Sequence, residues 1–173
     1  MSKFNEIFLT FCLLIGVTIG NLKKIVKDEP DITNEEIMIY LKDQKAKYNI
    51  TDEFLHYIAL AGVFPPRRNI VKHWETNEQL FLDLVKNDGK LGLDHFMQAL
   101  VLYFIRIYKH ELSKYAPTFV KKLLDQNVVS EKFIQEWYDK TIRLDKDSYL
   151  YDKKAERKFR DLLPDFIEWM KNA

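Results

Sequence analysis

The stretch "LDHFMQALVLYFIRIYKHEL", residues 93–112, decides the fold class. Between Phe96 and Tyr108 its apolar side chains occupy nearly every face of a helix. A helix at a protein surface carries an apolar stripe on one side only, so this one is expected to be covered by its neighbours. The pattern predicts a central helix over about residues 93 to 110, with Leu100 and Phe104 in the core.

Helix signals also precede this stretch. Thr33-Asn34-Glu35-Glu36 forms a capping box, which predicts a helix over about residues 34 to 47. Thr51 is the expected N-cap of the next helix, which must end before Pro65-Pro66. After the prolines, regularly spaced apolar residues predict one further helix that ends at Asn-Asp-Gly, residues 87–89.

Three more helices are predicted towards the C-terminus. "APTFVKKLLDQ" is entered through Pro117, "SEKFIQEWYDK" has Ser130 as its N-cap, and the charged segment 143–160 indicates a solvated helix supported by Glu156 with Arg160. No strand run with turn chemistry occurs in the sequence. The chain is therefore expected to be all-α, a HEAT-like α-solenoid of antiparallel helical hairpins, with an irregular four-helix bundle as the competing interpretation.

Charge limits the partners that the whole molecule can attract. The chain has 173 residues and a formal net charge of +1, so a nucleic acid or a membrane surface would need a local basic patch. No RNA-recognition motif accompanies the basic residues, so direct nucleic-acid binding is not expected, and an RNA-binding helical module is the weakest of the functional alternatives. The candidate basic contacts are Arg67, Arg68, Lys72, Lys114, Lys121 and Lys122.

Enzymatic chemistry has little support in the sequence. There is no glycine-rich phosphate loop and no G-x-S-x-G, and the single thiol, Cys12, lies in an apolar run where it would be inert. The four histidines lack the spacing of a metal site, and scattered surface or half-buried histidines are the favoured interpretation. The sequence therefore predicts no enzyme, no metal and no cofactor.

The N-terminal residues allow two interpretations. "IFLTFCLLIGVTIG", residues 7–20, is uncharged and could be the apolar part of a signal peptide, and Asn49-Ile50-Thr51 is a glycosylation sequon. Glu6 precedes the run, no A-x-A site follows it, and it is too short to span a bilayer comfortably. The favoured interpretation is a buried helix of a cytosolic protein, with residues 1–20 as an extension of a domain over 21–173 and no membrane contact.

Two boxes near the C-terminus mix aromatic and acidic residues, "SEKFIQEWYDK" (130–140) and "DLLPDFIEWMKNA" (161–173). Helical spacing puts Phe133 and Trp137 on one face, so the two tryptophan rings, Trp137 and Trp169, are expected to pack inward. The acids remain for the exposed side, where carboxylates beside aromatic faces suit lysine-rich ligands.

These boxes resemble the two-tryptophan, acidic/aromatic-box domain that closes eukaryotic translation initiation factor 5. "VKHWETNEQLFLDLVKNDGKLGLDHFMQALVLYF" resembles the middle of that domain, and the likeness runs from about residue 22 to residue 173. Related domains end the catalytic epsilon subunit of the exchange factor for initiation factor 2 and a regulatory protein that mimics factor 5. The resemblance implies a HEAT-type α-solenoid.

The function that the resemblance implies is that of a cytoplasmic, monomeric adaptor in translation initiation. It would bind lysine-rich segments of the beta subunit of initiation factor 2, and also contact factors 1, 3 and 4G. The alternative from another class is a guanine-nucleotide exchange domain acting on factor 2. The binding residues carried over are Glu131, Glu136, Trp137, Tyr138, Asp139, Asp165, Phe166, Glu168 and Trp169.

The sequence departs from factor 5 in two places. Nothing in residues 1–20 corresponds to the zinc-containing GTPase-activating domain of factor 5, so the chain is expected to be a fragment, isoform or mimic that does not activate GTP hydrolysis. The strongly acidic tail of the family does not follow the second box. Affinity for a lysine-rich partner is therefore expected to be weaker than in factor 5.

Overall fold

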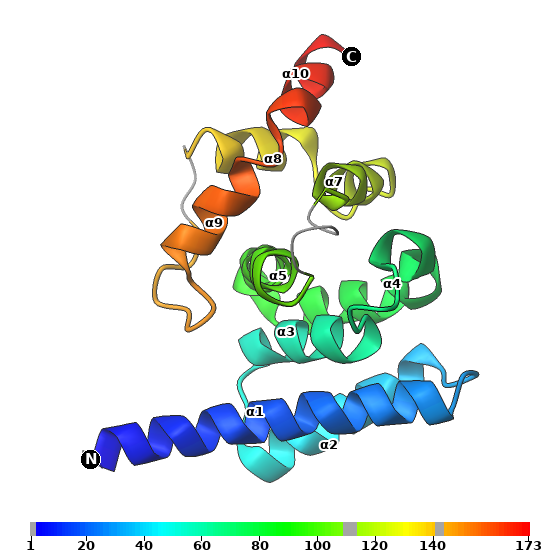
Figure 1. Cartoon of the computed structure of the whole chain (residues 1–173), viewed down its shortest axis with the longest axis vertical. Helices are drawn as coiled ribbons and strands as arrows, with labels where there is room; N and C mark the ends of the chain where they lie inside the picture. Colours follow the sequence, from blue (N-terminus) through cyan, green and yellow to red (C-terminus); the bar gives the residue numbers. More distant parts are fainter. Residues whose placement is uncertain (1–2, 109–113, 141–143) are drawn as a thin grey trace.

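The chain folds into stacked helices (Figure 1). The computed structural model describes residues 3–108, 114–140 and 144–173, and every regular element within these ranges is helical. The all-α class predicted from the sequence is confirmed. The elements are α1 (Lys3–Asp28), α2 (Asn34–Tyr48), α3 (Asp52–Val63), α4 (Ile70–Asn87), the 3₁₀ turn η1 (Gly89–Leu91), α5 (Gly92–Leu102), the π-helical turn η2 (Tyr103–Ile107), α7 (Ala116–Asp125), α8 (Glu131–Tyr138), α9 (Lys153–Arg160) and α10 (Pro164–Asn172).

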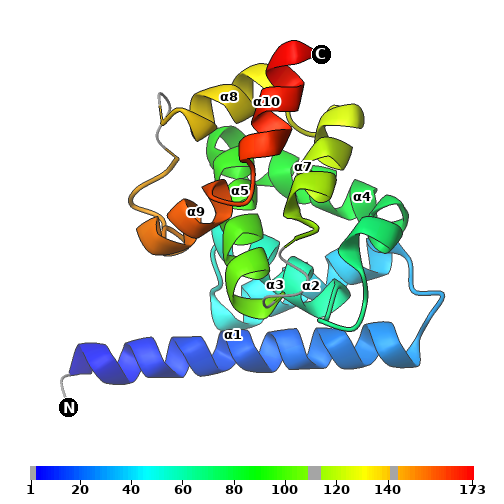
Figure 2. The same ribbon diagram turned by 45° about the horizontal axis from the view of Figure 1, so that its top comes forward.

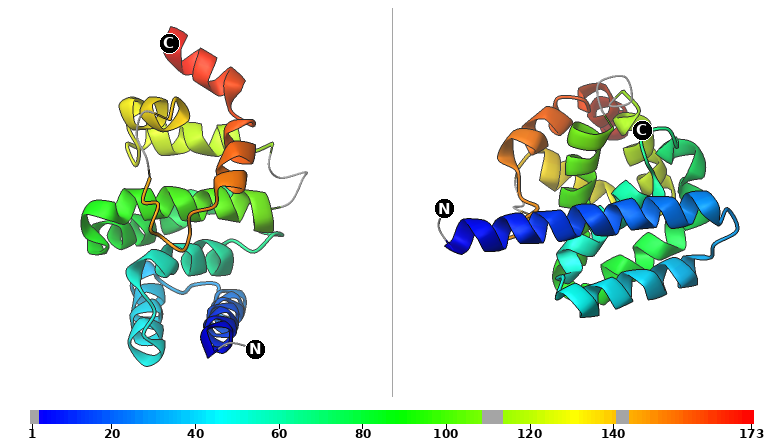
Figure 3. Two further views of the ribbon diagram at one scale, coloured as in Figure 1. Left: turned by 90° about the vertical axis from the view of Figure 1, so that its left-hand side faces the viewer. Right: turned by 60° about the horizontal axis from the view of Figure 1, so that its bottom comes forward.

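Alternate helices stack on one another. Helix α1 packs on α3 and α3 packs on α5, while α2 packs on α4 and α4 packs on α7. This stacking of helices one hairpin apart is the arrangement expected of a solenoid, and Figure 3 shows the successive layers from the side. Assignment to the HEAT type stays a prediction. Helices α8 and α10 lie at the end of the molecule opposite α1, as Figures 1 and 2 both show.

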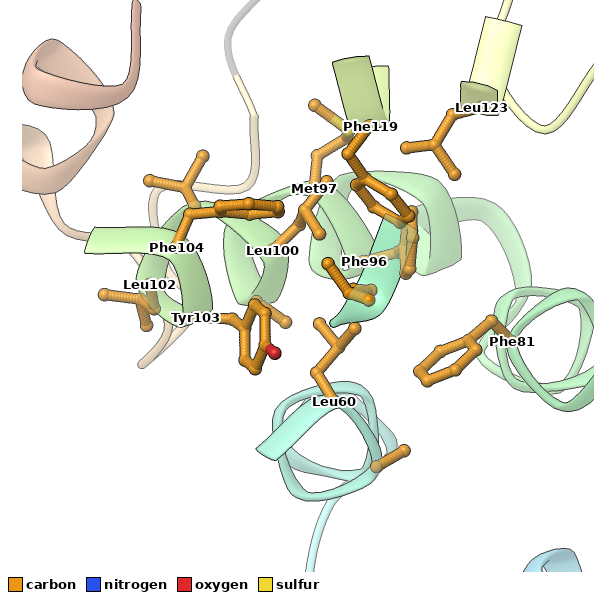
Figure 4. Close-up of a cluster of buried hydrophobic side chains, with 14 of the residues drawn as sticks. Leu60, Phe81, Phe96, Met97, Leu100, Leu102, Tyr103, Phe104, Phe119 and Leu123 are labelled. Carbon is orange, nitrogen blue, oxygen red and sulfur yellow. The ribbon is translucent and has the colours of Figure 1, made fainter. Parts of the chain in front are cut away.

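Helix α5 is the centre of the core, as predicted. Leu100 and Phe104 are completely buried, and Phe81 of α4 and Phe119 of α7 lie near the helix (Figure 4). The α-helix is shorter than expected, because it ends at Leu102 and continues as the π-helical turn η2. Tyr103 in that turn donates a hydrogen bond from its hydroxyl to the carbonyl of Phe64 at 2.7 Å, which ties the turn to the end of α3. The predicted residues 109–112 lie outside the described part of the chain.

Local capping explains why several other helices begin where the sequence predicted. The hydroxyl of Thr33 accepts a hydrogen bond from the N–H of Glu36 at 3.2 Å, and the Glu36 carboxylate accepts one from the N–H of Thr33 at 2.8 Å. This is the predicted capping box of α2. Ser130 caps α8 in the same way, by accepting a hydrogen bond from the N–H of Phe133 at 3.1 Å.

The predicted solvated helix over residues 143–160 is wrong in its first half. Residues 144–152 form no helix, and Leu144 and Leu150 of this segment are buried. Helix α9 begins only after Asp152, whose carboxylate caps it. The predicted pair of Glu156 with Arg160 exists at 3.1 Å, but Glu156 is buried and Arg160 is half-buried rather than solvated. Residue 143 is outside the described ranges.

The expectation of a buried N-terminal helix is correct for one face of α1 only. Ile15, Thr18 and Leu22 are buried, whereas Leu13 and Val17 on the outer face are 69% and 53% exposed. The helix window Leu9–Asp28, which extends beyond the uncharged run 7–20, is long and apolar enough to cross a membrane by length and composition alone. Helix α1 runs unbroken past residue 20. The division of the chain into an extension over residues 1–20 and a domain over residues 21–173 stays a prediction.

Candidate protein-binding surface

The first box places its tryptophan inside the protein. Trp137 is completely buried, and its ring centre lies 5.9 Å from that of Phe159 on α9. The guanidinium carbon of Arg160 lies 5.0 Å from the centre of the Trp137 ring, close enough for a cation–π contact. The prediction that Trp137 packs inward is confirmed. Its role is to fix α8 against α9.

The second box places its tryptophan at the surface. Trp169 is 46% exposed, and it stacks on the buried ring of Phe166 with centroids 5.8 Å apart and an angle of 29° between the planes. The prediction that Trp169 packs inward was wrong. Helix α10 turns Phe166, Ile167 and Met170 towards the core, and this leaves position 169 on the outer side of the helix.

A lysine of the same chain lies over the exposed ring. The ammonium nitrogen of Lys121, on α7, is 5.1 Å from the centre of the Trp169 ring. The same nitrogen forms an ion pair with Asp125 at 2.7 Å, one turn further along α7. Trp169 therefore has a geometry in which an ammonium group contacts its face, and the lysine that does so is also held by the exposed carboxylate of Asp125.

The acidic side chains of the two boxes lie on the outside of α8 and α10. Glu136 is half-buried and lies 3.9 Å from the ammonium of Lys132, and Tyr138 is also half-buried. The sequence prediction that the acids flank the aromatic residues on the exposed side agrees with these positions, and their role in binding stays a prediction. The exposed acids are Glu131, Asp139, Asp165 and Glu168.

The structure gives several of the candidate basic residues partners within the chain. Arg68 donates a hydrogen bond to the carbonyl of Val63 at 3.0 Å, and Lys122 forms an ion pair with Glu75 at 2.9 Å. These contacts join neighbouring elements, so both residues have a structural explanation. The role of the basic residues in binding a nucleic acid stays a prediction. The exposed ones are Arg67, Lys72 and Lys114.

A buried polar network, which the sequence interpretation missed, connects the two halves of the chain. The carboxylate of Asp88 lies 2.8 Å from Nε2 of His56 and 2.6 Å from Nδ1 of His95. The Nε2 atom of His95 lies 2.8 Å from the carboxylate of Asp145, whose carbonyl accepts a hydrogen bond from Gln98 at 2.6 Å. The expectation of scattered histidines was therefore wrong for His56 and His95. The signal available in the sequence was that each of the two histidines lies within a largely apolar stretch of its helix.

The two histidines of this network differ in their titration. Burial lowers the pKa of His56, and its contact with Asp88 only partly offsets this effect. Burial also acts to lower the pKa of His95, but hydrogen bonds to Asp145 and Asp88 outweigh it and raise the pKa above its ordinary value. The network thus favours a charged His95 between two carboxylates beside a neutral His56. No group of three or more candidate ligands that could hold a metal ion occurs in the searched, described residues.

Comparison with protein families finds a match to the part of the chain that carries both boxes. Residues 94–173 match the W2 family, which is described as eIF4-gamma/eIF5/eIF2-epsilon. The resemblance stated from the two boxes is confirmed over this W2 region. W2 domains are protein-binding domains of translation initiation factors. No curated protein and no solved structure matches the chain.

The W2 region begins within α5 and therefore includes α7 to α10 with both tryptophans of the boxes. The core extends further than this region. Trp74 on α4 packs edge-to-face on Phe119 of the W2 region at 5.1 Å, and the Asp88 carboxylate bonds to His95. The helices before residue 94 therefore share one core with the W2 region. The resemblance over residues 22–93 stays a prediction.

Proposed function

We propose that the chain is a non-enzymatic adaptor of translation initiation whose W2 region binds lysine-rich segments of the beta subunit of initiation factor 2. The match of residues 94–173 to the W2 family supports the class of protein. The observation that supports this kind of ligand is the exposed face of Trp169, over which Lys121 already lies. A lysine of the partner would occupy the same position.

The contact on Trp169 is a cation–π interaction, which attracts an ammonium to the electron-rich face of an indole. Phe166 stacks beneath the indole and is itself buried, so the ring is held in place before a ligand arrives. A pre-ordered aromatic surface loses little side-chain entropy on binding. The Trp169–Phe166 pair is accordingly the proposed anchor of the site.

The exposed carboxylates of α8 and α10 are proposed to attract the other lysines of the same segment. Such exposed charges increase the rate of encounter more than they increase the final affinity, and salt screens them. This division of roles predicts that the acids confer salt dependence, while Trp169 supplies a contact that salt weakens less. Contacts with initiation factors 1, 3 and 4G, and a cytoplasmic location, belong to the same proposal.

A titration with a lysine-rich peptide tests the acidic part of the proposal. The double variant Glu131→Lys with Glu168→Lys reverses one exposed acid on each box helix. Its matched control is Glu35→Lys with Asp43→Lys on α2, which changes the net charge equally at two exposed acids away from the boxes. We expect the box variant to weaken calorimetric binding much more than the control. Equal losses of affinity in both variants would mean that only the net charge matters, and this would contradict the proposed site.

A nucleotide-release assay tests the alternative function. The family description includes eIF2-epsilon, which keeps an exchange domain as the second candidate. If the chain binds as an adaptor, adding it to initiation factor 2 loaded with labelled GDP leaves the release rate unchanged. Faster release would favour the exchange domain instead. A titration of RNA in the same buffers would reveal a steep salt slope if the chain were an RNA-binding module.

A further inference from the structure

The outer face of α1 carries an apolar stripe that nothing in the described structure covers. Leu9, Leu13 and Val17 are 49%, 69% and 53% exposed, and they follow one another at a spacing of four residues. Residues four apart lie on the same side of a helix, so the three side chains form one continuous strip. α1 forms one edge of the molecule along its length (Figures 1 and 2). An exposed apolar strip of this kind marks an interaction surface.

Two glycines continue the strip, and the fold of the single chain does not explain them. A Cβ atom added at Gly16 or Gly20 would meet nothing within 4 Å. Gly62 on α3 is different, because a Cβ there would lie 2.6 Å from Leu22 of α1. Glycine inside a helix is destabilising relative to alanine, and its usual reason is the close approach of another backbone. At Gly16 and Gly20 no part of the described structure makes that approach, so the two glycines leave room for a backbone from outside the chain.

The inner face of α1 argues that the missing partner is not a lipid bilayer. Leu22 and Thr18 are completely buried, and the hydroxyl of Tyr40 on α2 donates a hydrogen bond to the carbonyl of Thr18 at 3.1 Å. Phe11 packs edge-to-face on Phe54 of α3 at 4.9 Å. Spanning a membrane would separate α1 from α2 and α3 and expose this part of the core. A partner that covers only the outer face leaves these contacts in place.

The charges at the two ends of the strip identify the partner. Glu6 is exposed at the beginning of α1, and Lys24 and Lys27 are exposed near its end on the same side of the helix. The residues between them on the strip are uncharged. A second α1 lying antiparallel would place Glu6 opposite Lys24 at both ends of the pair, with Leu13 against Val17 in the middle. The strip is therefore complementary to itself in that orientation.

In place of the monomer expected from the sequence, we propose that two copies of this chain associate through the outer faces of their α1 helices, packed antiparallel with Gly16 and Gly20 at the closest approach. Such a contact is isologous and closes at a dimer. The W2 boxes lie at the opposite end of the molecule, so both copies keep their boxes free (Figure 1). A dimer would present two box surfaces to one lysine-rich segment or to two. The dimer itself does not depend on the proposed function.

Sedimentation equilibrium over a concentration series tests the association. We expect a reversible dimer for the wild-type chain, and Leu13→Glu should raise its dissociation constant by more than about tenfold, because a carboxylate would be buried without a partner. Ile39→Glu is the matched control, since Ile39 on α2 is also exposed and aliphatic but lies outside the strip. Circular dichroism confirms that both variants fold. A monomer at all concentrations, or equal dimerisation of Leu13→Glu and wild type, would overturn the proposal.

A charge exchange tests the antiparallel orientation. Glu6→Lys and Lys24→Glu should each weaken the dimer, because each variant places like charges opposite one another at both ends. The double variant in one chain should restore wild-type association if the helices are antiparallel, whereas a parallel pair would gain nothing from it. Failure of the double variant to recover would contradict the antiparallel arrangement.

Flotation with vesicles of phosphatidylcholine and phosphatidylserine tests whether the strip binds a membrane instead. Flotation of the wild-type chain with vesicles, lost in Leu13→Glu, would assign the strip to a membrane and overturn the proposal. We expect no flotation of the folded dimer.

Discussion

The ammonium of Lys121 lies 5.1 Å from the centre of the Trp169 ring, so the protein places one of its own lysines on the exposed aromatic residue of the second box. Lys121 comes from α7 and Trp169 from the last helix. If the site binds lysine-rich segments, Lys121 occupies the position that the ligand needs. The contact would then act as an internal competitor for the site.

Removal of that competitor should strengthen binding. We expect Lys121→Ala to increase the affinity for a lysine-rich peptide about two- to fivefold, because an exposed cation–π contact contributes only ~0.5–1 kcal/mol. Lys42→Ala on α2 removes the same charge from an exposed position outside the boxes and should change the affinity less. Calorimetric titration of both variants makes the comparison. Unchanged or weaker binding in Lys121→Ala alone would contradict competition at Trp169.

The two box tryptophans should separate stability from binding. Trp137 is completely buried, so Trp137→Ala should reduce the free energy of unfolding by ~3–5 kcal/mol. Trp169 is about half-exposed, so Trp169→Ala should reduce it by less than ~1.5 kcal/mol while weakening peptide binding. Urea denaturation of both variants measures the two values. Equal destabilisation would mean that Trp169 is a core residue.

Helix starts were predictable from the sequence because their causes are local. The capping box of Thr33 with Glu36 and the Ser130 cap each lie within four consecutive residues. The segment 144–152 was misread as helix because its structure depends on distant partners. Asp145 bonds to His95, 50 residues away, and such a pair leaves no periodic pattern in the sequence.

The candidate surface was predictable in position but not in detail. Both boxes lie within the residues that match the W2 family, and they were visible in the sequence as acidic residues beside tryptophans, while their role in binding stays a prediction. The inward or outward direction of a ring in a short terminal helix depends on which face its neighbours cover. Trp137 meets Phe159 and is buried, whereas Trp169 is turned away from the core. The exposed strip on α1 was missed for the same reason.

Stability should depend on pH through His95. Its pKa is raised above its ordinary value, since the hydrogen bonds to Asp145 and Asp88 outweigh the effect of burial. A histidine with a raised pKa stabilises the fold fully below its unfolded value, and this contribution is lost as the pH rises through the folded value. His95→Gln should therefore cost more stability at about pH 6 than at about pH 8.

Thermal or urea denaturation at both pH values measures this difference. His73→Gln is the control, because His73 is exposed and its pKa is lowered, first by the partial loss of its hydration and then by the charges of Arg68 and Lys72. The loss of stability caused by His73→Gln should not be greater at the lower pH than at the higher pH. A cost of His95→Gln that is the same at both pH values would show that the charged form contributes nothing.

Two glycine substitutions should have opposite effects on stability. Gly62→Ala forces a methyl group to within 2.6 Å of Leu22, so we expect a loss of ~1–3 kcal/mol from the contact between α1 and α3. Gly16→Ala meets nothing within 4 Å, and at low protein concentration it should stabilise α1 by ~0.5–1 kcal/mol. Denaturant unfolding measures both. Destabilisation by Gly16→Ala under these conditions would contradict the open outer face of α1.

The central claim is that Trp169 anchors a lysine-rich ligand, and calorimetric titration of wild type, Trp169→Phe and Trp169→Ala at two salt concentrations tests it most directly. We expect Trp169→Ala to lose roughly tenfold or more in affinity at both salt concentrations, as the loss of an anchor residue at an interface costs about 1–2 kcal/mol or more. The affinity of Trp169→Phe should lie between those of wild type and Trp169→Ala, because the phenyl ring is a weaker cation–π partner than the indole. Equal affinity of wild type and Trp169→Ala, with both folded, would contradict the account.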